Sequence, residues 1–239
     1  MTDKEHIVSA FDRDLAAVQT LIMKMGGMVE TAISDAARAL ELRDVELAEQ
    51  VRKNDKQIDA LEEQVASEVA RIIATRSPTA GDLRTVLTVL KISGNLERMG
   101  DYAKNLGKRT SVLSEMPAIN GSGGALRRMV QLVSLMLKDA LDAYIQRDVA
   151  LAEDVRRRDG DVDQMYNALF REFLTHMMED PRNITACMHL HFIAKNVERM
   201  GDHVTSISEQ VIYLVTGGLP EEDRDKQDKT SIDSALGKV

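Results

Sequence analysis

The sequence predicts an all-α protein built as two tandem, pseudo-symmetric antiparallel three-helix bundles. Three observations support this prediction. Apolar residues recur at alternating steps of three and four in six separate stretches, which is the spacing of a helix with one buried face. Aromatic residues, which favour strands, make up only 3% of the 239 residues. The second half of the chain also repeats motifs of the first half, as expected for an internal duplication.

The first half contains three helical stretches. Gly26 and Gly27 are expected to weaken the first of them locally. The turn-like segment TRSPTAGD separates the second from the third, and Asp82 is expected to cap the third helix. The apolar positions of the three stretches are Phe11, Leu15, Val18, Ile22, Met25 and Val29; Leu47, Val51, Ile58, Leu61, Val65, Val69 and Ile72; and Val89, Ile92, Leu96, Met99, Ala103 and Leu106.

The segment SEMPAINGSGG (114–124) interrupts the pattern with proline and small residues. We therefore predict a first bundle over residues 1–114, a linker over 115–124 and a second bundle over 125–218. The charged remainder, 219–239, is predicted to be a disordered tail. The second bundle takes its apolar positions from Leu126, Val130, Val133, Leu137, Leu141 and Tyr144; Leu151, Val155, Val162, Met165, Leu169 and Phe173; and Leu190, Ile193, Val197, Met200, Val204, Ile207, Val211 and Leu214.

Two pairs of repeated motifs establish the duplication. RDVELAEQVRKND (43–55) and RDVALAEDVRRRD (147–159) are identical at nine of thirteen positions, and NLERMGD (95–101) returns as NVERMGD (196–202). Because Asp44 and Asp148 precede apolar helical runs, we expect both to be helix N-caps.

The repeated motifs also contain acidic residues that lie off the apolar seam. Each half has two Asp or Glu residues four apart on one helix and two more on the next helix, so each pair shares a helix face. Like charges at this spacing destabilise a helix by about 0.2–0.5 kcal/mol per pair. The four pairs are Asp55 with Asp59, Glu97 with Asp101, Asp159 with Asp163, and Glu198 with Asp202.

Two explanations account for these acids. A solvated acidic face neutralised by Lys53, Arg98 and Arg199 is the structural one. The other is a hard metal ion, because carboxylate oxygens are the ligands that Mg, Mn, Ca and ferric iron prefer. Four pairs at corresponding positions favour metal sites, and their place beside the seam predicts an open, wet site on the flank of the bundle.

Composition and motifs exclude several classes. The net charge of −8 argues against a nucleic-acid partner. The single cysteine, Cys187, excludes an internal disulfide, and neither a signal peptide nor an apolar membrane span is present, so a cytoplasmic location is expected. We find no phosphate-binding loop, nucleophile elbow or zinc spacing. Asn95 and Asn196 are expected to make structural hydrogen bonds, and His203 is not counted as a ligand because Tyr102 corresponds to it.

Over residues 6–217 the chain resembles the PhoU family of phosphate-signalling regulators. The resemblance is carried by the duplicated layout and by NLERMGDYAKN, NVERMGDHVTS, KNDKQIDALE and RRDGDVDQMY. It implies two similar three-helix bundles side by side, with the four acidic pairs as metal ligands. Some family members hold multinuclear iron clusters there; for this chain iron, zinc, magnesium and manganese all stay open.

The resemblance also implies a function. Family members are cytoplasmic, often dimeric, and reach the membrane only through their partners. They act between the phosphate ABC transporter and a phosphate-sensing histidine kinase, repress phosphate-starvation signalling and restrain phosphate uptake. No enzymatic activity and no catalytic residue are expected. Two alternatives are a metal-free helical adaptor and a carboxylate-bridged di-metal oxidase, although the oxidase requires Glu-x-x-His on two helices, which neither half contains.

Overall fold

The computed structural model describes the backbone of residues 3–119 and 122–220 and the side chains of residues 10–119 and 123–220. This part of the chain confirms the predicted all-α fold with two repeats. Most of the predicted tail, 221–239, lies outside the described residues. The elements are α1 (Asp3–Leu42), α2 (Val45–Arg76), α3 (Ala80–Leu113), α4 (Ser122–Gln146), α5 (Val149–Glu179), the short 3-10 helix η1 (Pro181–Asn183) and α6 (Ile184–Thr216).

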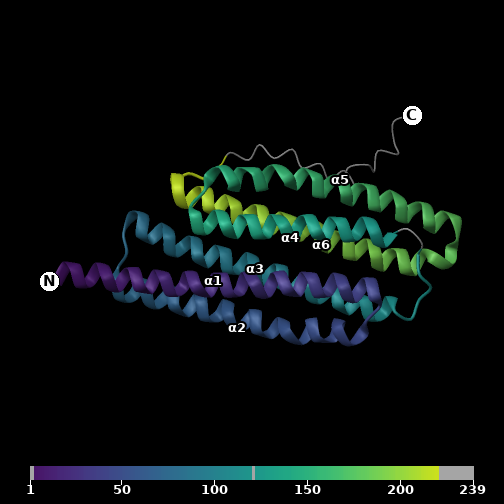
Figure 1. Ribbon diagram of the computed structural model, residues 1–239, viewed down its shortest axis with the longest axis horizontal. Helices are drawn as coiled ribbons and strands as arrows, with labels where there is room; N and C mark the ends of the chain where they lie inside the picture. Colours follow the sequence, from purple (N-terminus) through teal and green to yellow (C-terminus); the bar gives the residue numbers. More distant parts are fainter. Residues whose placement is uncertain (1–2, 120–121, 221–239) are drawn as a thin grey trace.

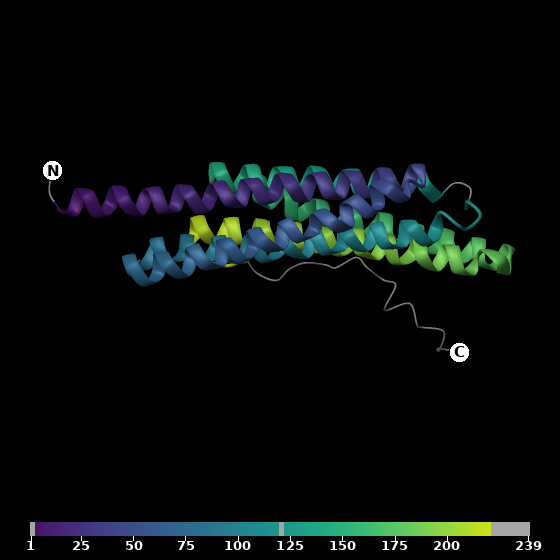
Figure 2. The same cartoon turned by 90° about the horizontal axis from the view of Figure 1, so that it is seen from below.

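The axes of the six long helices are aligned with the long axis of the molecule, and consecutive helices point in opposite directions (Figure 1). Figure 2 shows that they form a flat, elongated body rather than two separate globules. Helix α3 packs against α1, α2 and α6, while α6 packs against α3, α4 and α5, so these two helices form the centre. The buried apolar residues of both halves belong to one continuous core. In the described residues no helix has the length and apolarity required to cross a bilayer.

The same turn begins the second helix of each half, and it confirms both predicted N-caps. The Asp44 carboxylate accepts a hydrogen bond from the Leu47 N–H at 2.9 Å, and Asp148 accepts one from Leu151 at 3.0 Å. The arginine before each aspartate has a positive φ, 56° at Arg43 and 54° at Arg147. The repeated RDV motif therefore ends one helix and starts the next.

The turn between α2 and α3 differs from the sequence prediction. Thr79 is the N-cap of α3 and makes no side-chain capping bond, whereas Asp82 lies inside the first turn. Asp82 therefore acts through its negative charge near the helix N-terminus and does not cap the helix.

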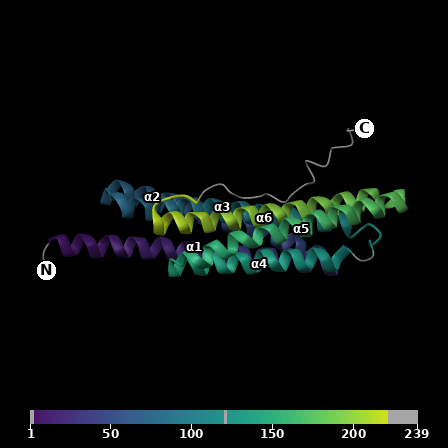
Figure 3. The same ribbon diagram turned by 90° about the horizontal axis from the view of Figure 1, so that it is seen from above.

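Glycines mark the places where helices approach closely. Helix α1 continues without a break through Gly26, where an added Cβ would lie 2.5 Å from the Leu141 side chain of α4. Figure 3 shows α1 beside α4. On α3, a Cβ at Gly107 would lie 2.8 Å from the backbone oxygen of Ala48 on α2. Because Gly107 has no side chain, α3 can lie directly against α2. This contact positions the acidic residues.

Candidate functional site

The four acids of the first half gather where α2 faces α3, and one lysine joins two of them. The Lys104 ammonium donates to Asp55 Oδ2 on α2 at 2.5 Å and to Asp101 Oδ1 on α3 at 3.0 Å. These two hydrogen bonds hold the pKa of Lys104 above its usual range. A single cation thus joins two carboxylates from neighbouring helices.

The remaining two acids of this cluster lie within reach of the same charges. Burial raises the pKa of Asp59, and the neighbouring Asp55 carboxylate raises it further. Burial also raises the pKa of Glu97, and the neighbouring Asp101 carboxylate raises it further. The charge of Lys104 favours the ionised form of Asp59 but does not outweigh these effects. Negative potential therefore persists at this end of the cluster, which can attract a further cation.

Small residues bring the first cluster together. Asp55 Oδ1 lies 3.5 Å from the place where a Cβ of Gly100 would be. The same arrangement recurs in the second half, where Asp159 Oδ1 lies 3.2 Å from the Cβ position of Gly201. The glycine of each ERMGD motif thus leaves room for an aspartate from the preceding helix.

The second cluster lies between α5 and α6 and has its own lysine. Lys195 Nζ donates to Glu198 Oε1 at 2.8 Å and lies 4.8 Å from the centroid of the Tyr166 ring of α5. Asp163 and Tyr166 are three apart on α5, so they share one face of that helix. The ammonium is thereby held between the two helices by an ion pair and a cation–π contact.

The predicted open flank is wrong for half of the acids. Glu97 and Asp101 have side chains that are 26% and 34% exposed. Four others are only 3–8% exposed, and they are Asp55, Asp159, Asp163 and Glu198. Asp55 on α2 and Asp159 and Asp163 on α5 are buried because these helices pack against the central helices α3 and α6, and Glu198 lies on α6 itself. The seam spacing alone does not reveal this packing.

The predicted counter-ions were also incomplete. Of the three proposed cations, Arg98 approaches Glu97 at 3.6 Å with a side chain that is 63% exposed. Lys53 on α2 and Arg199 on α6 are exposed. The closer partners, Lys104 and Lys195, were missed, although each lies three residues from an acid of its own motif, which is the spacing of a helical ion pair.

In this arrangement each cluster contains a lysine that is paired with at least one of its carboxylates. Among the described residues, no three or more histidine, cysteine and acidic side chains converge as a metal site requires. The donor set suits a hard cation, and one oxygen of the buried Asp55 carboxylate, Oδ1, has no hydrogen-bond partner. Binding a metal between Asp55 and Asp101 would require the Lys104 ammonium to withdraw.

Asn95 makes the structural hydrogen bond expected from the sequence. Its Nδ2 donates to the Lys91 carbonyl at 2.8 Å, which leaves Oδ1 as the acceptor for His203 Nδ1 at 2.8 Å. Burial lowers the pKa of His203. This hydrogen bond connects α3 to α6, and the Tyr102 ring lies 5.6 Å from the imidazole. His203 therefore joins the two halves.

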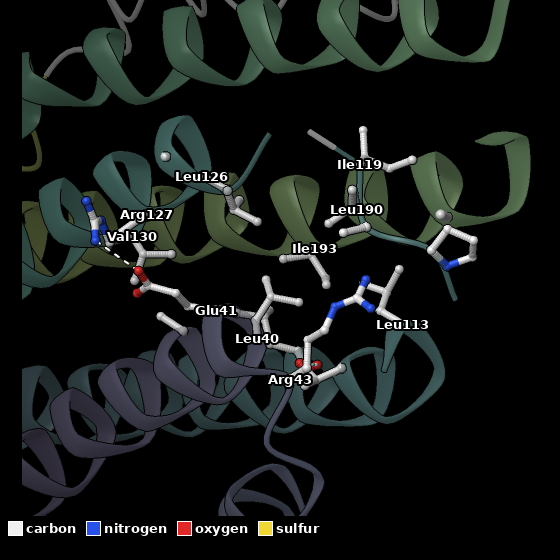
Figure 4. A pocket seen from close by; sticks show the side chains of 18 residues that line it. Leu40, Glu41, Arg43, Leu113, Ile119, Leu126, Arg127, Val130, Leu190 and Ile193 are labelled. Carbon is white, nitrogen blue, oxygen red and sulfur yellow. Dashed lines mark hydrogen bonds and ion pairs between the residues drawn. The ribbon is translucent and has the colours of Figure 1, made fainter. Parts of the chain in front are cut away.

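A separate cavity of about 370 Å³ lies where the linker meets helices of both halves (Figure 4). Its wall is mostly apolar and includes Leu113, Leu190 and Ile193. At its rim Arg127 pairs with Glu41 at 3.0 Å, and Arg43 donates to the Met116 carbonyl at 2.7 Å. None of the eight predicted acids lines this cavity.

The fold and the site together define a duplicated helical protein with one acidic cluster between paired helices in each half. The family model described as "PhoU domain" matches the chain twice, over residues 22–110 and 126–211. The chain belongs to the PhoU family.

Relatives and solved structures agree with this assignment. The chain is 42% identical, over 98% of both sequences, to a "Phosphate-specific transport system accessory protein PhoU homolog" of Rhizobium meliloti. It is 48% identical to the protein of that name from Zymomonas mobilis, over 92% of this chain and 93% of the relative. The crystal structure of PhoU from Pseudomonas aeruginosa has 38% identity and a TM-score of 0.84, covering 87% of this chain and all of the other. The structure of the phosphate transport system regulatory protein PhoU from Streptococcus pneumoniae has 29% identity and a TM-score of 0.81, over 88% and 99%.

Proposed function

We propose that this protein is a cytoplasmic, non-enzymatic accessory protein of a phosphate-specific transport system. One observation carries the proposal: similarity to relatives of that name extends over nearly the whole chain and includes both repeats. The protein would act between the phosphate ABC transporter and its histidine kinase, repress phosphate-starvation signalling and restrain phosphate uptake. It would do so by binding one state of a partner in preference to another.

Deleting the protein in its native host tests this role. Expression from a phosphate-starvation promoter should rise in high phosphate and return to the repressed level when the intact chain is restored. Recovery of the transporter and the kinase with the purified protein, in high and in low phosphate, identifies the partners. Unchanged promoter activity in the deletion strain would refute the regulatory role.

We also propose that the two acidic clusters bind metal ions, with iron, zinc, magnesium and manganese as candidates. The matched carboxylates and the Asp55 Oδ1 atom without a hydrogen bond support this proposal. Metal content should be measured on untagged protein purified without chelator. The double variant Glu97→Gln with Asp101→Asn should contain less metal. Asp161→Asn is the control, because Asp161 lies between Asp159 and Asp163 on α5 but is exposed.

A metal-free adaptor is a second candidate, and the Lys104 bridge favours it. An ammonium between Asp55 and Asp101 compensates their charges without any metal. The two candidates differ in metal content: an adaptor would bind its partners equally well before and after treatment with a chelator. A homodimer is proposed in either case, and light scattering on the intact chain measures it.

A further inference from the structure

The two clusters conserve their acids but not their lysines. Lys104 lies three residues after Asp101, and the corresponding position in the second half is Thr205. Lys195 lies three residues before Glu198, and the corresponding position in the first half is Gly94. Each half therefore supplies an ammonium to its acidic cluster from the opposite end of the repeated motif.

Lys104 compensates a carboxylate that is buried. Asp55 is 3% exposed, and a buried charge without a partner is strongly destabilising. Lys104 satisfies Oδ2, while Oδ1 lies against Gly100 without a hydrogen bond. One half of this carboxylate is thus satisfied by a cation, and the other half faces the α2–α3 contact.

The lysine side chain can leave this position more readily than the carboxylate can. The Lys104 side chain is 29% exposed, so its flexible four-carbon stem reaches the cluster from the solvent side. Lys195 is equally exposed where it meets Glu198. Both ammonium groups can therefore move into water without unfolding a helix.

We propose that Lys104 and Lys195 are tethered counter-cations that compete with metal ions for the two acidic clusters. This inference rests on the metal binding proposed above and adds its regulation. An ammonium and a hard metal ion are both attracted to the carboxylates of Asp55 and Asp101, and the two cations repel each other at short distance. Metal uptake is therefore an exchange reaction, and each cluster has its own competitor.

Removing one ammonium tests the proposal. In Lys104→Met the apolar stem remains and the charge is lost. Full-length, untagged protein is stripped with chelator, freed of chelator and titrated calorimetrically with Mn²⁺ at fixed pH and salt. We expect Lys104→Met to bind Mn²⁺ about tenfold more tightly than the wild type. Lys108→Met, an exposed lysine one turn further along α3, should bind as the wild type does.

Two further variants assign the effect to its cluster. The gain in Lys104→Met should persist when the second cluster is weakened by Glu198→Gln. It should disappear when Asp101→Asn is added, because that change removes the shared ligand. If Lys104→Met does not fold without metal, Lys104→Gln keeps a neutral hydrogen bond to Asp55 and takes its place. Lys195→Met should tighten binding only in a chain whose second cluster is intact.

The outcomes separate this inference from the metal proposal. Equal Mn²⁺ affinity in the wild type and Lys104→Met overturns the competition and leaves metal binding intact. Binding by Lys104→Met alone supports the competition and contradicts a native metal site in the first cluster. Binding by neither protein contradicts both.

Discussion

Asp55 and Asp59 are one helical turn apart on α2, yet their surroundings differ. Asp55 is held by an ammonium, whereas Asp59 has a pKa raised by burial and by the neighbouring Asp55 carboxylate. Glu97, on α3, has a pKa raised in the same way by burial and by Asp101. Asp59 and Glu97 are thus retained although they oppose folding of the metal-free chain, as expected for functional residues.

Asp59→Asn and Glu97→Gln should each stabilise the metal-free protein while weakening metal binding. Each removes one like-charge neighbour at helical spacing, which contributes about 0.2–0.5 kcal/mol per pair. Thermal unfolding in chelator at pH 7 measures the gain. Because the folded-state pKa of the carboxyl is raised above its unfolded value, the wild type becomes more stable as the pH falls through the folded pKa towards the unfolded one. The difference in melting temperature between each variant and the wild type should therefore become smaller in that pH range.

The control for these variants is Asp161→Asn, which neutralises an exposed carboxylate outside the clusters. It should leave the melting temperature nearly unchanged. A loss of stability in Asp59→Asn at pH 7 would contradict the prediction and indicate that this carboxylate makes a favourable interaction in the metal-free state.

At the scale of helices, close approach explains residues that the sequence pattern identified but did not interpret. Gly100 and Gly201 stand out as repeated identities, but their role depends on how closely α2 and α5 cross them. Helix existence, the N-caps Asp44 and Asp148 and the two repeats could be predicted because they depend on local spacing. Crossing distances depend on the tertiary packing of two helices and could not.

Gly107→Ala should destabilise the protein by about 1–3 kcal/mol, because the new Cβ would meet a backbone oxygen that cannot move independently. Gly94→Ala on the same helix is the matched comparison. No atom lies within 4 Å of its Cβ position, and alanine in a helix interior is favoured over glycine by about 0.5–1 kcal/mol. Chemical denaturation of both variants measures the difference. Equal effects of the two changes would show that the α2–α3 contact is not tight at Gly107.

The contact between α1 and α2 should weaken in acid at one carboxylate, which pairs with two arginines. Asp14 on α1 accepts hydrogen bonds from Arg71 and Arg76 on α2, both at 2.9 Å. These bonds, that from Arg71 first, hold the pKa of Asp14 below its usual range. A lowered folded-state pKa means that the stabilisation is complete above the unfolded value of 3.8 and is lost as pH falls through the folded value.

Asp14→Asn should therefore cost about 0.5–1 kcal/mol at pH 7 and little near pH 3. Denaturation at both pH values measures this, with the exposed neighbour Asp12→Asn as control. An equal loss of unfolding free energy at both pH values would mean that the packing of the Asp14 side chain, and not its charge, stabilises the contact between these helices.

The candidate site was predicted less completely than the helices. The eight acids were identified because their spacing is regular and repeated. The partners Lys104 and Lys195 were not, because a lysine three residues from an acid is common and its side-chain direction depends on the facing helix. The burial of Glu198 likewise depends on α6 being central, which results from contacts between the repeats.

At the scale of the whole molecule, the two repeats share one core. The buried residues of α1–α3 and α4–α6 form a continuous cluster, and α3 lies against α6. The Asn95–His203 hydrogen bond adds a polar contact at this interface. Because neither half buries its apolar surface alone, we expect the repeats to unfold together although they arose by duplication.

Phe173→Ala tests this cooperativity from the far end of the second repeat. Phe173 is 1% exposed on α5, and loss of a buried phenylalanine costs about 3–5 kcal/mol. If the core is shared, amide hydrogen exchange should accelerate in α2 of the first repeat as well as in α5, and unfolding should stay a single transition at lower temperature. The neighbouring Leu174 is 40% exposed, so Leu174→Ala should change exchange little in either repeat. Two separate transitions, with hydrogen exchange in α2 unchanged by Phe173→Ala, would mean that the repeats fold as independent units. The two acidic clusters could then influence each other only through bound partners.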